Sequence, residues 1–121
     1  MNKQLTKKLD VAFSKMIRKR DDKGGYFICC SCGQTKSSEQ ADAGHFINRK
    51  WVSTRWHEEN VHSQCRACNR FDEGNASGYA LFMINKYGKE RVEFLQALSR
   101  HTAKYSDSDG ELMLKDFKSR T

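Results

Sequence analysis

Cys29-Cys30-Ser31-Cys32 and Cys65-Arg66-Ala67-Cys68 are the two stretches that decide the fold of this chain. Each holds a Cys-x2-Cys pair, so that Cys29, Cys32, Cys65 and Cys68 together offer four thiolates. Zinc binds such sets tetrahedrally with Zn–S bonds of about 2.3 Å. Because the binding free energy is of the order of 10 kcal/mol, such a site contributes directly to folding. We therefore predict one structural Zn²⁺ held by these four cysteines.

The number and spacing of the cysteines argue against a redox centre. A thioredoxin-like site needs one Cys-x2-Cys at the start of a helix, and two pairs do not fit that pattern. Disulfides are rare in a reducing cytosol, where cysteine clusters are more often metal sites. The fifth cysteine, Cys30, receives no role. The 32 residues between the pairs exceed a short zinc ribbon, so a substructure must loop out between them.

Short strands and loops are expected around the cysteines. Tyr26-Phe27-Ile28 is β-prone and leads into the first pair, and Gly33 fits the tight turn of a zinc knuckle. The further elements expected here are a polar loop at 34–41, a strand at 42–47, a long loop at 48–59, a second strand or turn at 60–64, and a helix that starts near Cys68 or Asn69 and ends at Gly74.

Helices are expected on both sides of this central part. Residues 4–20 form an amphipathic pattern with an apolar face at three- and four-residue spacings, and the basic residues around it fit either a solvated face or a contact with a DNA backbone. The apolar face consists of Leu5, Leu9, Phe13, Met16 and Ile17. The last third predicts one helix ending at Gly88, a second ending around His101, and a short final helix after a turn at 106–110.

The charge balance favours a polyanionic partner. Lys and Arg number 22 against 15 acidic residues, which gives a net charge of +7 and a pI near 9.3. Each phosphate that a basic side chain neutralises releases counterions, so DNA is the expected partner. No apolar run approaches the roughly 20 residues of a membrane span, and no signal peptide is visible. A cytoplasmic location without membrane contact is therefore expected, in the host cytoplasm if a phage encodes the chain.

The segment between and after the cysteine pairs resembles the HNH nuclease motif. That motif has a His at the end of one strand, an Asn on the loop, and a His or Asn that opens a helix. Here Asn60 follows His45 by 15 residues, and Asn69 follows Asn60 by nine, directly after the second cysteine pair. Both spacings are typical of the motif. The resemblance implies an α+β fold with a small ββα-metal core, treble-clef-like and stapled by zinc, at 26–75. An N-terminal helix at 4–20 and C-terminal helices at 76–118 complete one nuclease domain over 1–121.

The residue types suit phosphodiester hydrolysis. The reaction needs a water nucleophile, a base and a cation at the scissile phosphate. We assign His45 as the base, since a neutral imidazole suits that role, and Asn60 to the holding of the hairpin loop or the orientation of the ring. Mg²⁺ or Mn²⁺ prefers oxygen ligands, which the amide of Asn69 can supply. Glu73, four residues later, shares its helical face if the helix persists, and HNH relatives often carry a ligand there.

A further metal ligand is harder to place. Many HNH enzymes carry Asp or His directly before the catalytic His, but here that position is Gly44. Asp42 is the candidate, although its odd offset from His45 points it to the opposite strand face unless a bulge at Gly44 turns it. Otherwise water and Glu73 complete the shell, or His45 is itself a ligand.

Basic residues of the long loop are candidates for DNA contacts. Arg49, Lys50 and Arg55 are assigned to nucleic-acid binding, and Arg55 could also stabilise the transition state by pairing with a phosphate. Trp51 and Trp56 in the same loop either pack the hairpin or stack on unpaired bases.

Beyond the generic motif, the chain resembles the phage NinG (Rap recombination endonuclease) family. The strings that carry the resemblance are Ala43-Gly44-His45-Phe46-Ile47, Thr54-Arg55-Trp56-His57-Glu58-Glu59-Asn60, Gln64-Cys65 and Cys68-Asn69. The start at Lys8-Leu9-Asp10 and the later Tyr79 and Tyr87-Gly88 extend it over roughly 5–100. The resemblance implies a structure-specific endonuclease that cuts branched intermediates of phage recombination, such as D-loops or Holliday junctions. Symmetric cutting of both strands of a junction would suit a homodimer. The alternative is a zinc-stabilised DNA-binding module without catalysis, in which Gly44 marks a lost metal site.

Overall fold

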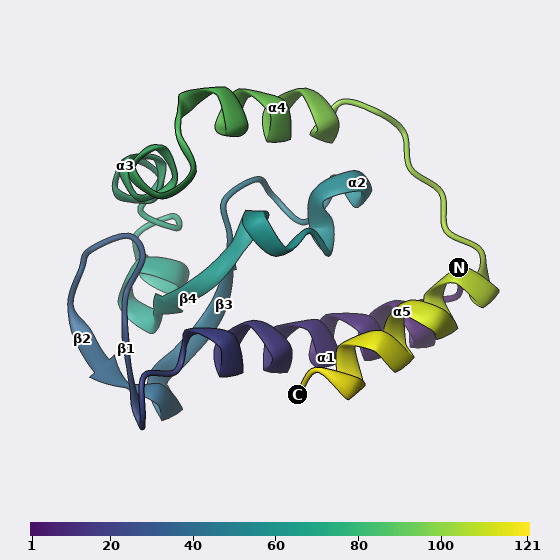
Figure 1. The fold of residues 1–121 in the computed structure, drawn as a ribbon, viewed down its shortest axis with the longest axis horizontal. Helices are drawn as coiled ribbons and strands as arrows, with labels where there is room; N and C mark the ends of the chain where they lie inside the picture. Colours follow the sequence, from purple (N-terminus) through teal and green to yellow (C-terminus); the bar gives the residue numbers. More distant parts are fainter.

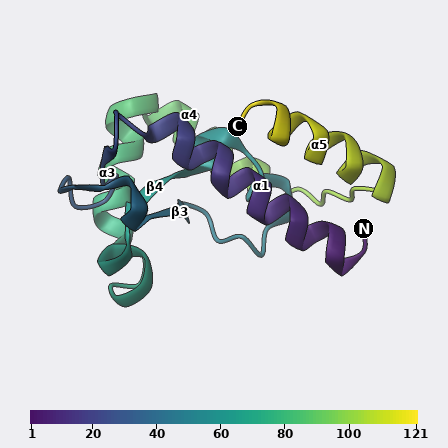
Figure 2. The ribbon, with the colours of Figure 1, turned by 90° about the horizontal axis from the view of Figure 1, so that it is seen from below.

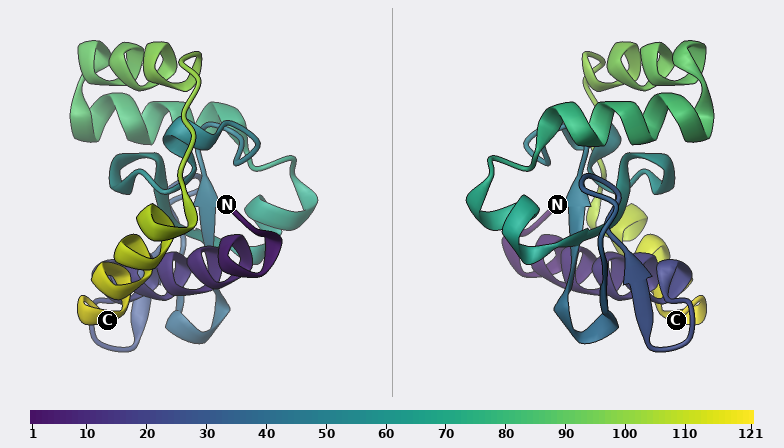
Figure 3. Two further views of the ribbon diagram at one scale, coloured as in Figure 1. Left: turned by 90° about the vertical axis from the view of Figure 1, so that its right-hand side faces the viewer. Right: turned by 90° about the vertical axis from the view of Figure 1, so that its left-hand side faces the viewer.

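A computed structural model describes all residues, 1–121. At its centre lies an antiparallel pair of strands, β3 (Ala41–His45) and β4 (Val61–Cys65), in which Asp42 pairs with Gln64 and Gly44 with His62. Helices surround this pair (Figure 1), and both views of Figure 3 place α3 and α4 together on one side of the molecule and α1 with α5 on the other. The remaining elements are β1 (Tyr26–Ile28), β2 (Thr35–Ser37), α1 (Lys3–Asp21), α2 (Val52–Arg55), α3 (Ala76–Tyr87), α4 (Lys89–Ser99) and α5 (Asp107–Ser119), with 3-10 turns at Ser38–Gln40 and Glu58–Asn60 and a π-helix at Ala67–Phe71. The α+β expectation is confirmed.

Helix α1 forms as its apolar spacing predicts. The side chain of Asn2 accepts a hydrogen bond from the amide of Leu5 at 2.8 Å and so caps the first turn. Basic residues in the last turn suit the negative end of the helix dipole. All five expected apolar residues are buried, and Val61 of β4 joins them in one core cluster. The helix therefore supports the face of the sheet that it covers.

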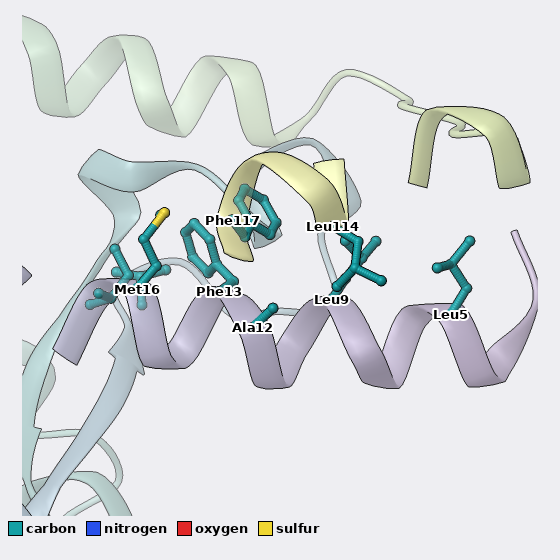
Figure 4. Packing of buried hydrophobic residues seen from close by; sticks show 9 residues of the cluster. Leu5, Leu9, Ala12, Phe13, Met16, Leu114 and Phe117 are labelled. Atoms are coloured by element: carbon teal, nitrogen blue, oxygen red, sulfur yellow. The ribbon is translucent and has the colours of Figure 1, made fainter. Parts of the chain in front are cut away.

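Helix α5 lies along α1 (Figure 2). In Figure 4 the ring of Phe117 faces Phe13, and the ring centroids are 5.1 Å apart. Leu114 packs beside Leu9 in the same cluster, and each such buried side chain contributes roughly 1.5–3 kcal/mol. The final helix, expected to be short, has 13 residues, because Ser106 and Asp109 form a reciprocal capping box that starts it early.

The stretch 34–41, expected to be a polar loop, instead contains strand β2 and a 3-10 turn. The chain reverses at Gly33, whose φ of +75° suits glycine, and β2 then pairs antiparallel with β1. Two further expectations, one about a loop and one about a helix, need correction. The long loop 48–59 contains the short helix α2, and the helix after Cys68 is a π-helix that ends at Phe71.

Helices α3 and α4 pack on the outside of the first cysteine stretch. A Cβ on Gly78 would lie 2.2 Å from the carbonyl oxygen of Ser31, so only glycine lets α3 approach so closely. Gly88, at φ +87°, turns the chain from α3 into α4. A third apolar cluster joins these helices to Cys30. None of the helices combines the length and apolar character that crossing a membrane requires.

Candidate metal centre and adjoining cleft

The four paired cysteines meet at one point. The sulfur atoms of Cys29, Cys32, Cys65 and Cys68 all lie within 4.8 Å of one another. Those of Cys32 and Cys65 are 3.8 Å apart. A tetrahedron with Zn–S bonds of about 2.3 Å has edges of about 3.8 Å, so the spacing fits the ion. The cluster could therefore hold a metal ion such as zinc.

Hydrogen bonds to sulfur prepare the site for an ion. The amide of Cys65 donates to Cys29 Sγ at 3.3 Å, and Asn75 Nδ2 donates to Cys68 Sγ at 3.4 Å. Burial raises the pKa of Cys29, but backbone N–H groups that point at its sulfur outweigh burial and lower the pKa to about 7. Burial and neighbouring cysteines raise the pKa of Cys68 to about 12 and also raise the pKa of Cys32. Since thiolates are the metal-binding form, Cys29 is the thiol best prepared to bind an ion.

Cys30 is not part of this cluster. Its side chain is buried against Tyr79, Met83, Val92 and Leu95 between α3 and α4. Burial raises the pKa of the Cys30 thiol to about 12, so it stays protonated. Cys30 is therefore a packed core residue.

A polar cleft of about 810 Å³ runs beside the metal centre, along β3 and the loop that follows Cys68. Four of the residues predicted for catalysis and metal binding line it together, namely His45, Asp42, Asn69 and Glu73. Arg49, predicted to bind nucleic acid, lines it too. Asn60, Arg55 and Lys50 do not.

The ring of His45 is held in one tautomer. Its Nε2 lies 2.8 Å from the backbone carbonyl oxygen of Arg55. A carbonyl only accepts, so Nε2 carries the proton and Nδ1 keeps a free lone pair. Burial lowers the pKa of His45 below its usual value, although Asp10 acts in the opposite direction. The imidazole is therefore neutral at pH 7.

Asp42 links β3 to the π-helix that contains Cys68. It accepts from Asn69 Nδ2 at 3.0 Å and from Arg70 Nε and Nη2 at 2.8 and 2.9 Å. Burial raises the pKa of Asp42, but Arg70 and Asn69 outweigh it and hold the pKa below its usual range. The strand register is continuous, without a bulge at Gly44. Asp42 and His45 still share the cleft, because the cleft follows the free edge of β3.

The space before His45 is taken by another side chain. A Cβ on Gly44 would lie 2.0 Å from Oε1 of Gln64. Gln64 is buried, and its Nε2 donates to Ser31 Oγ and to the carbonyl oxygen of Gly74. Gly44 is thus required by packing, and Gln64 ties the first cysteine stretch to the turn after Cys68.

Asn60 lies beneath the loop and not in the cleft. Its side chain accepts from the amide of Ile47 and donates to the carbonyl oxygens of Ile47 and Thr54, at 2.8, 3.1 and 3.0 Å. Of the two roles considered for it, the structure shows contacts that hold the loop and none to the His45 ring.

Arg55 is engaged within the protein. Its Nε and Nη2 donate to the carboxylate of Asp10 at 3.0 and 2.6 Å, and Trp56 Nε1 donates to the same carboxylate. The backbone carbonyl of Arg55 contacts His45, so the contacts of Asp10 with Arg55 and Trp56 fix the end of α2 that orients the ring.

Two sets of residues at or behind the cleft were not assigned to the candidate site from the sequence. The first set comprises arginines of the cleft, Arg18 from α1 and Arg66 after β4, which along with Arg49 have no carboxylate within salt-bridge distance. Their charge was visible, but their convergence depends on how α1 crosses β3. The second set is a hydrogen-bonded chain behind the cleft.

That chain runs from Tyr87 to the backbone before His45. Tyr79 Oη donates to the carbonyl oxygen of Gly44 at 2.7 Å, so it accepts from His62 Nδ1 at 3.1 Å. His62 Nε2 must then accept from Tyr87 Oη at 2.7 Å. Burial lowers the pKa of His62 to about 3, which keeps the ring neutral. The chain anchors the end of β3 to α3.

Comparisons with known proteins identify a family model and several relatives that match most of this chain. A family model described as "Bacteriophage Lambda NinG protein" matches residues 1–120. Protein ninG of Escherichia phage 933W is 36% identical over 92 residues, covering 75% of this chain and 44% of the relative. Protein ninG of Escherichia phage lambda is 35% identical over 92 residues (75% and 43%), and that of Salmonella phage P22 is 34% identical over 92 residues (75% and 43%). The matched part is therefore less than half the length of these relatives. No solved structure matches the chain.

Proposed function

The chain belongs to the NinG family of phage proteins, and from this premise we propose that it is a metal-dependent DNA endonuclease of the HNH (ββα-metal) type. It would hydrolyse phosphodiester bonds, with a preference for branched recombination intermediates such as D-loops or Holliday junctions. One observation carries the proposal: a single cleft brings a neutral histidine, three oxygen-bearing side chains and unpaired arginines together. A merely structural region has no need for that combination.

His45 is the general base of this proposal. Its neutral ring, with Nε2–H bound to Arg55, offers Nδ1 to a water molecule in the cleft. Nδ1 takes one proton from water as the water oxygen forms a bond to phosphorus, and the bond from phosphorus to the leaving oxygen breaks. The imidazolium formed is stabilised by the nearby carboxylate of Asp10, which favours the charged ring.

The oxygen atoms of the cleft suit a hard divalent cation. Asp42, Glu73 and the Oδ1 of Asn69 would hold Mg²⁺ or Mn²⁺, since Asn69 uses only its Nδ2 toward Asp42. When bound, the cation supplies charge stabilisation at the phosphate and the leaving oxygen. Such ions are commonly held by one or two carboxylates, water and substrate phosphates, so a preformed cage is not required.

The arginines are assigned to the substrate. Arg18, Arg49 and Arg66 reach the cleft without an acidic partner, so their charges are available to phosphates. Arg18 donates one hydrogen bond to Ser14 and Arg66 one to the carbonyl oxygen of Glu39, which leaves each guanidinium further donors. Arg55 retains only an indirect part, because Asp10 already occupies its guanidinium.

A plasmid-nicking assay tests the proposal. We expect supercoiled DNA to be nicked with Mg²⁺ or Mn²⁺ and to stay intact when neither cation is added. EDTA is not used, because it would also remove the structural zinc. His45→Ala should lower the rate by at least about a hundredfold, the usual contribution of a general base, while zinc content and DNA affinity stay near wild type. His101→Ala, an exposed histidine outside the cleft, is the matched control. Turnover retained by His45→Ala would refute the assignment of the base.

The second candidate function is a DNA-binding module without catalysis. It is favoured by the engagement of both Asp42 oxygens by Asn69 and Arg70. In addition, the cysteines are the one group of three or more His, Cys, Asp or Glu side chains whose ligand atoms converge. Wild-type protein that binds DNA but never nicks it with either cation would establish this function instead.

A further inference from the structure

Phe71 is the most exposed of the large apolar side chains, with 85% of its surface accessible. Exposed apolar residues are common on proteins, so exposure alone decides nothing. The position of Phe71 is what distinguishes it. Its chain neighbours Asn69, Arg70 and Glu73 all line the candidate nuclease cleft, so Phe71 belongs to a segment at the border of that cleft, although its own side chain does not line it.

The turn that carries Phe71 is firmly anchored. Phe71 ends the π-helix, a rare element that is often found at functional sites. Arg70 is fixed to Asp42 by two hydrogen bonds, and the amide of Gly74 donates to the carbonyl oxygen of the zinc ligand candidate Cys68 at 3.0 Å. The ring is therefore presented outward by a turn that is tied to β3 and to the metal centre.

The backbone of this turn is unusually constrained. Glu73, Gly74 and Asn75 follow one another with φ values of +47°, +80° and +45°. Asparagine tolerates this left-handed conformation, and Asn75 also caps α3. For Glu73 the conformation costs free energy, and such strain persists only where surrounding contacts hold it. An apolar ring on such a turn, beside a polar cleft, is suited to contact a ligand that is bound in the cleft.

The chemistry of the surroundings indicates what the ring contacts. Arg66 and Arg49 of the cleft suit phosphates, and the ligand moiety that is apolar, flat and adjacent to phosphate is a nucleobase. In an intact duplex both faces of each base are covered by its neighbours, whereas an unpaired base offers a face. Aromatic side chains stack on such bases or insert between base steps.

We infer that Phe71 stacks on an unpaired base at the border of the cleft, and so directs cleavage to DNA that contains one. The directing of cleavage rests on the proposed nuclease function, but the stacking does not. A phenyl ring has no hydrogen-bonding group, so the contact is indifferent to base identity. The substrate class is therefore duplex DNA with an unpaired or displaced base, of any sequence.

Binding is measured first, by fluorescence anisotropy without added Mg²⁺ or Mn²⁺ and without a chelator that would remove zinc. Three labelled DNAs are used: an intact duplex, the same duplex with one extra unpaired base, and that duplex with an abasic site in place of the extra base. Wild type should prefer the second DNA. Phe71→Ala should weaken that complex about tenfold, within the range for one stacked base, and the abasic site should have a similar effect. Combining the two changes should add little, because both remove the same contact.

Matched variants and cleavage rates complete the test. Phe71→Trp should retain the preference, and Phe94→Ala, which removes an exposed phenylalanine of α4, should behave as wild type. With Mg²⁺, Phe71→Ala should lose the faster cleavage of the bulged DNA while its rate on intact duplex is unchanged.

The two proposals fail separately. If no DNA is cut but the binding cycle holds, the nuclease proposal falls and the stacking contact stands. If wild type cleaves DNA but Phe71→Ala alters neither affinity nor preference, the inference is overturned, and Phe71 is left as a contact for another protein. Equal losses on bulged and intact DNA also overturn it.

Discussion

At the scale of single residues, His62 shows how burial and hydrogen bonding fix a protonation state. The ring accepts from Tyr87 at one nitrogen and donates to Tyr79 at the other, so an added proton would break the first contact. Burial lowers the pKa to about 3, against a usual value of 6.5. His62 is therefore a structural histidine that stays neutral at every pH at which the chain is expected to work.

This state predicts a loss of stability in mild acid. Below pH 6.5 the unfolded chain binds a proton at His62 that the folded chain does not bind until about pH 3. The free energy of unfolding should therefore fall as pH falls through that window, by about 2 kcal/mol between pH 7 and pH 5. Urea denaturation at the two pH values measures the change. His62→Gln should flatten it, and an equally steep fall in that variant would contradict the assignment.

Residue identity predicted some members of the cleft but not the contacts that they make. The motif spacing selected His45 and Asn69, which do line one cleft. It could not show that Asp10 holds Arg55, because 45 residues separate the two along the chain. The same holds for Arg70 and Asp42, whose pairing depends on the turn after Cys68.

At the scale of elements, the two cysteine stretches lie where a bound ion would staple the β1–β2 hairpin to β4. Their sulfurs converge, and only Phe27 and Ala41 join the buried cysteines in the apolar cluster there. Small domains commonly need such a metal to be stable. The β1–β2 hairpin should therefore depend on the ion more than α1 and α5, which share a larger apolar cluster.

Two cysteine substitutions test the staple. Cys65→Ser removes a ligand and should abolish zinc binding and cause unfolding, whereas Cys30→Ser should keep one zinc per chain and lose only about 1–3 kcal/mol for a buried hydroxyl. Zinc released on denaturation and circular dichroism give the two readouts. A folded, zinc-free Cys65→Ser protein would overturn the staple, and so would zinc loss in Cys30→Ser.

Apolar periodicity predicted the long helices, because each buries a continuous face. Strand β2 was missed because Thr35, Lys36 and Ser37 carry no apolar alternation, and its pairing depends on the turn at Gly33. A helix after the second cysteine pair was predicted, but its π geometry and its end at Phe71 were not. No apolar spacing in this short polar stretch distinguishes a π-helix from an α-helix.

At the scale of the whole molecule, the arginines fall into two groups, those with an acidic partner and those without one. Several arginines are neutralised within the protein, while Arg18, Arg49 and Arg66 stay unpaired at the cleft. The net charge of +7 alone predicted a polyanionic partner. The fold adds a location, since α1, β3 and the segment after β4 bring these charges to one face.

Salt dependence tests that location. If Arg49 contacts a phosphate, Arg49→Ala should weaken DNA binding and reduce the slope of log K against log salt by about one. Lys118→Ala, which removes an equal charge from α5 outside the cleft, should leave the slope unchanged. Anisotropy titrations over a range of salt concentrations give both slopes, and identical effects of the two variants would argue for diffuse attraction only.

The close approach of Gln64 to Gly44 also restricts how this sequence can change over time. A carboxylate placed before His45 would collide with the amide across the strand pair, so position 64 must become smaller before position 44 can become larger. Mutational paths between this chain and nucleases with an acidic residue there are thus ordered, and the two positions should vary together among descendants.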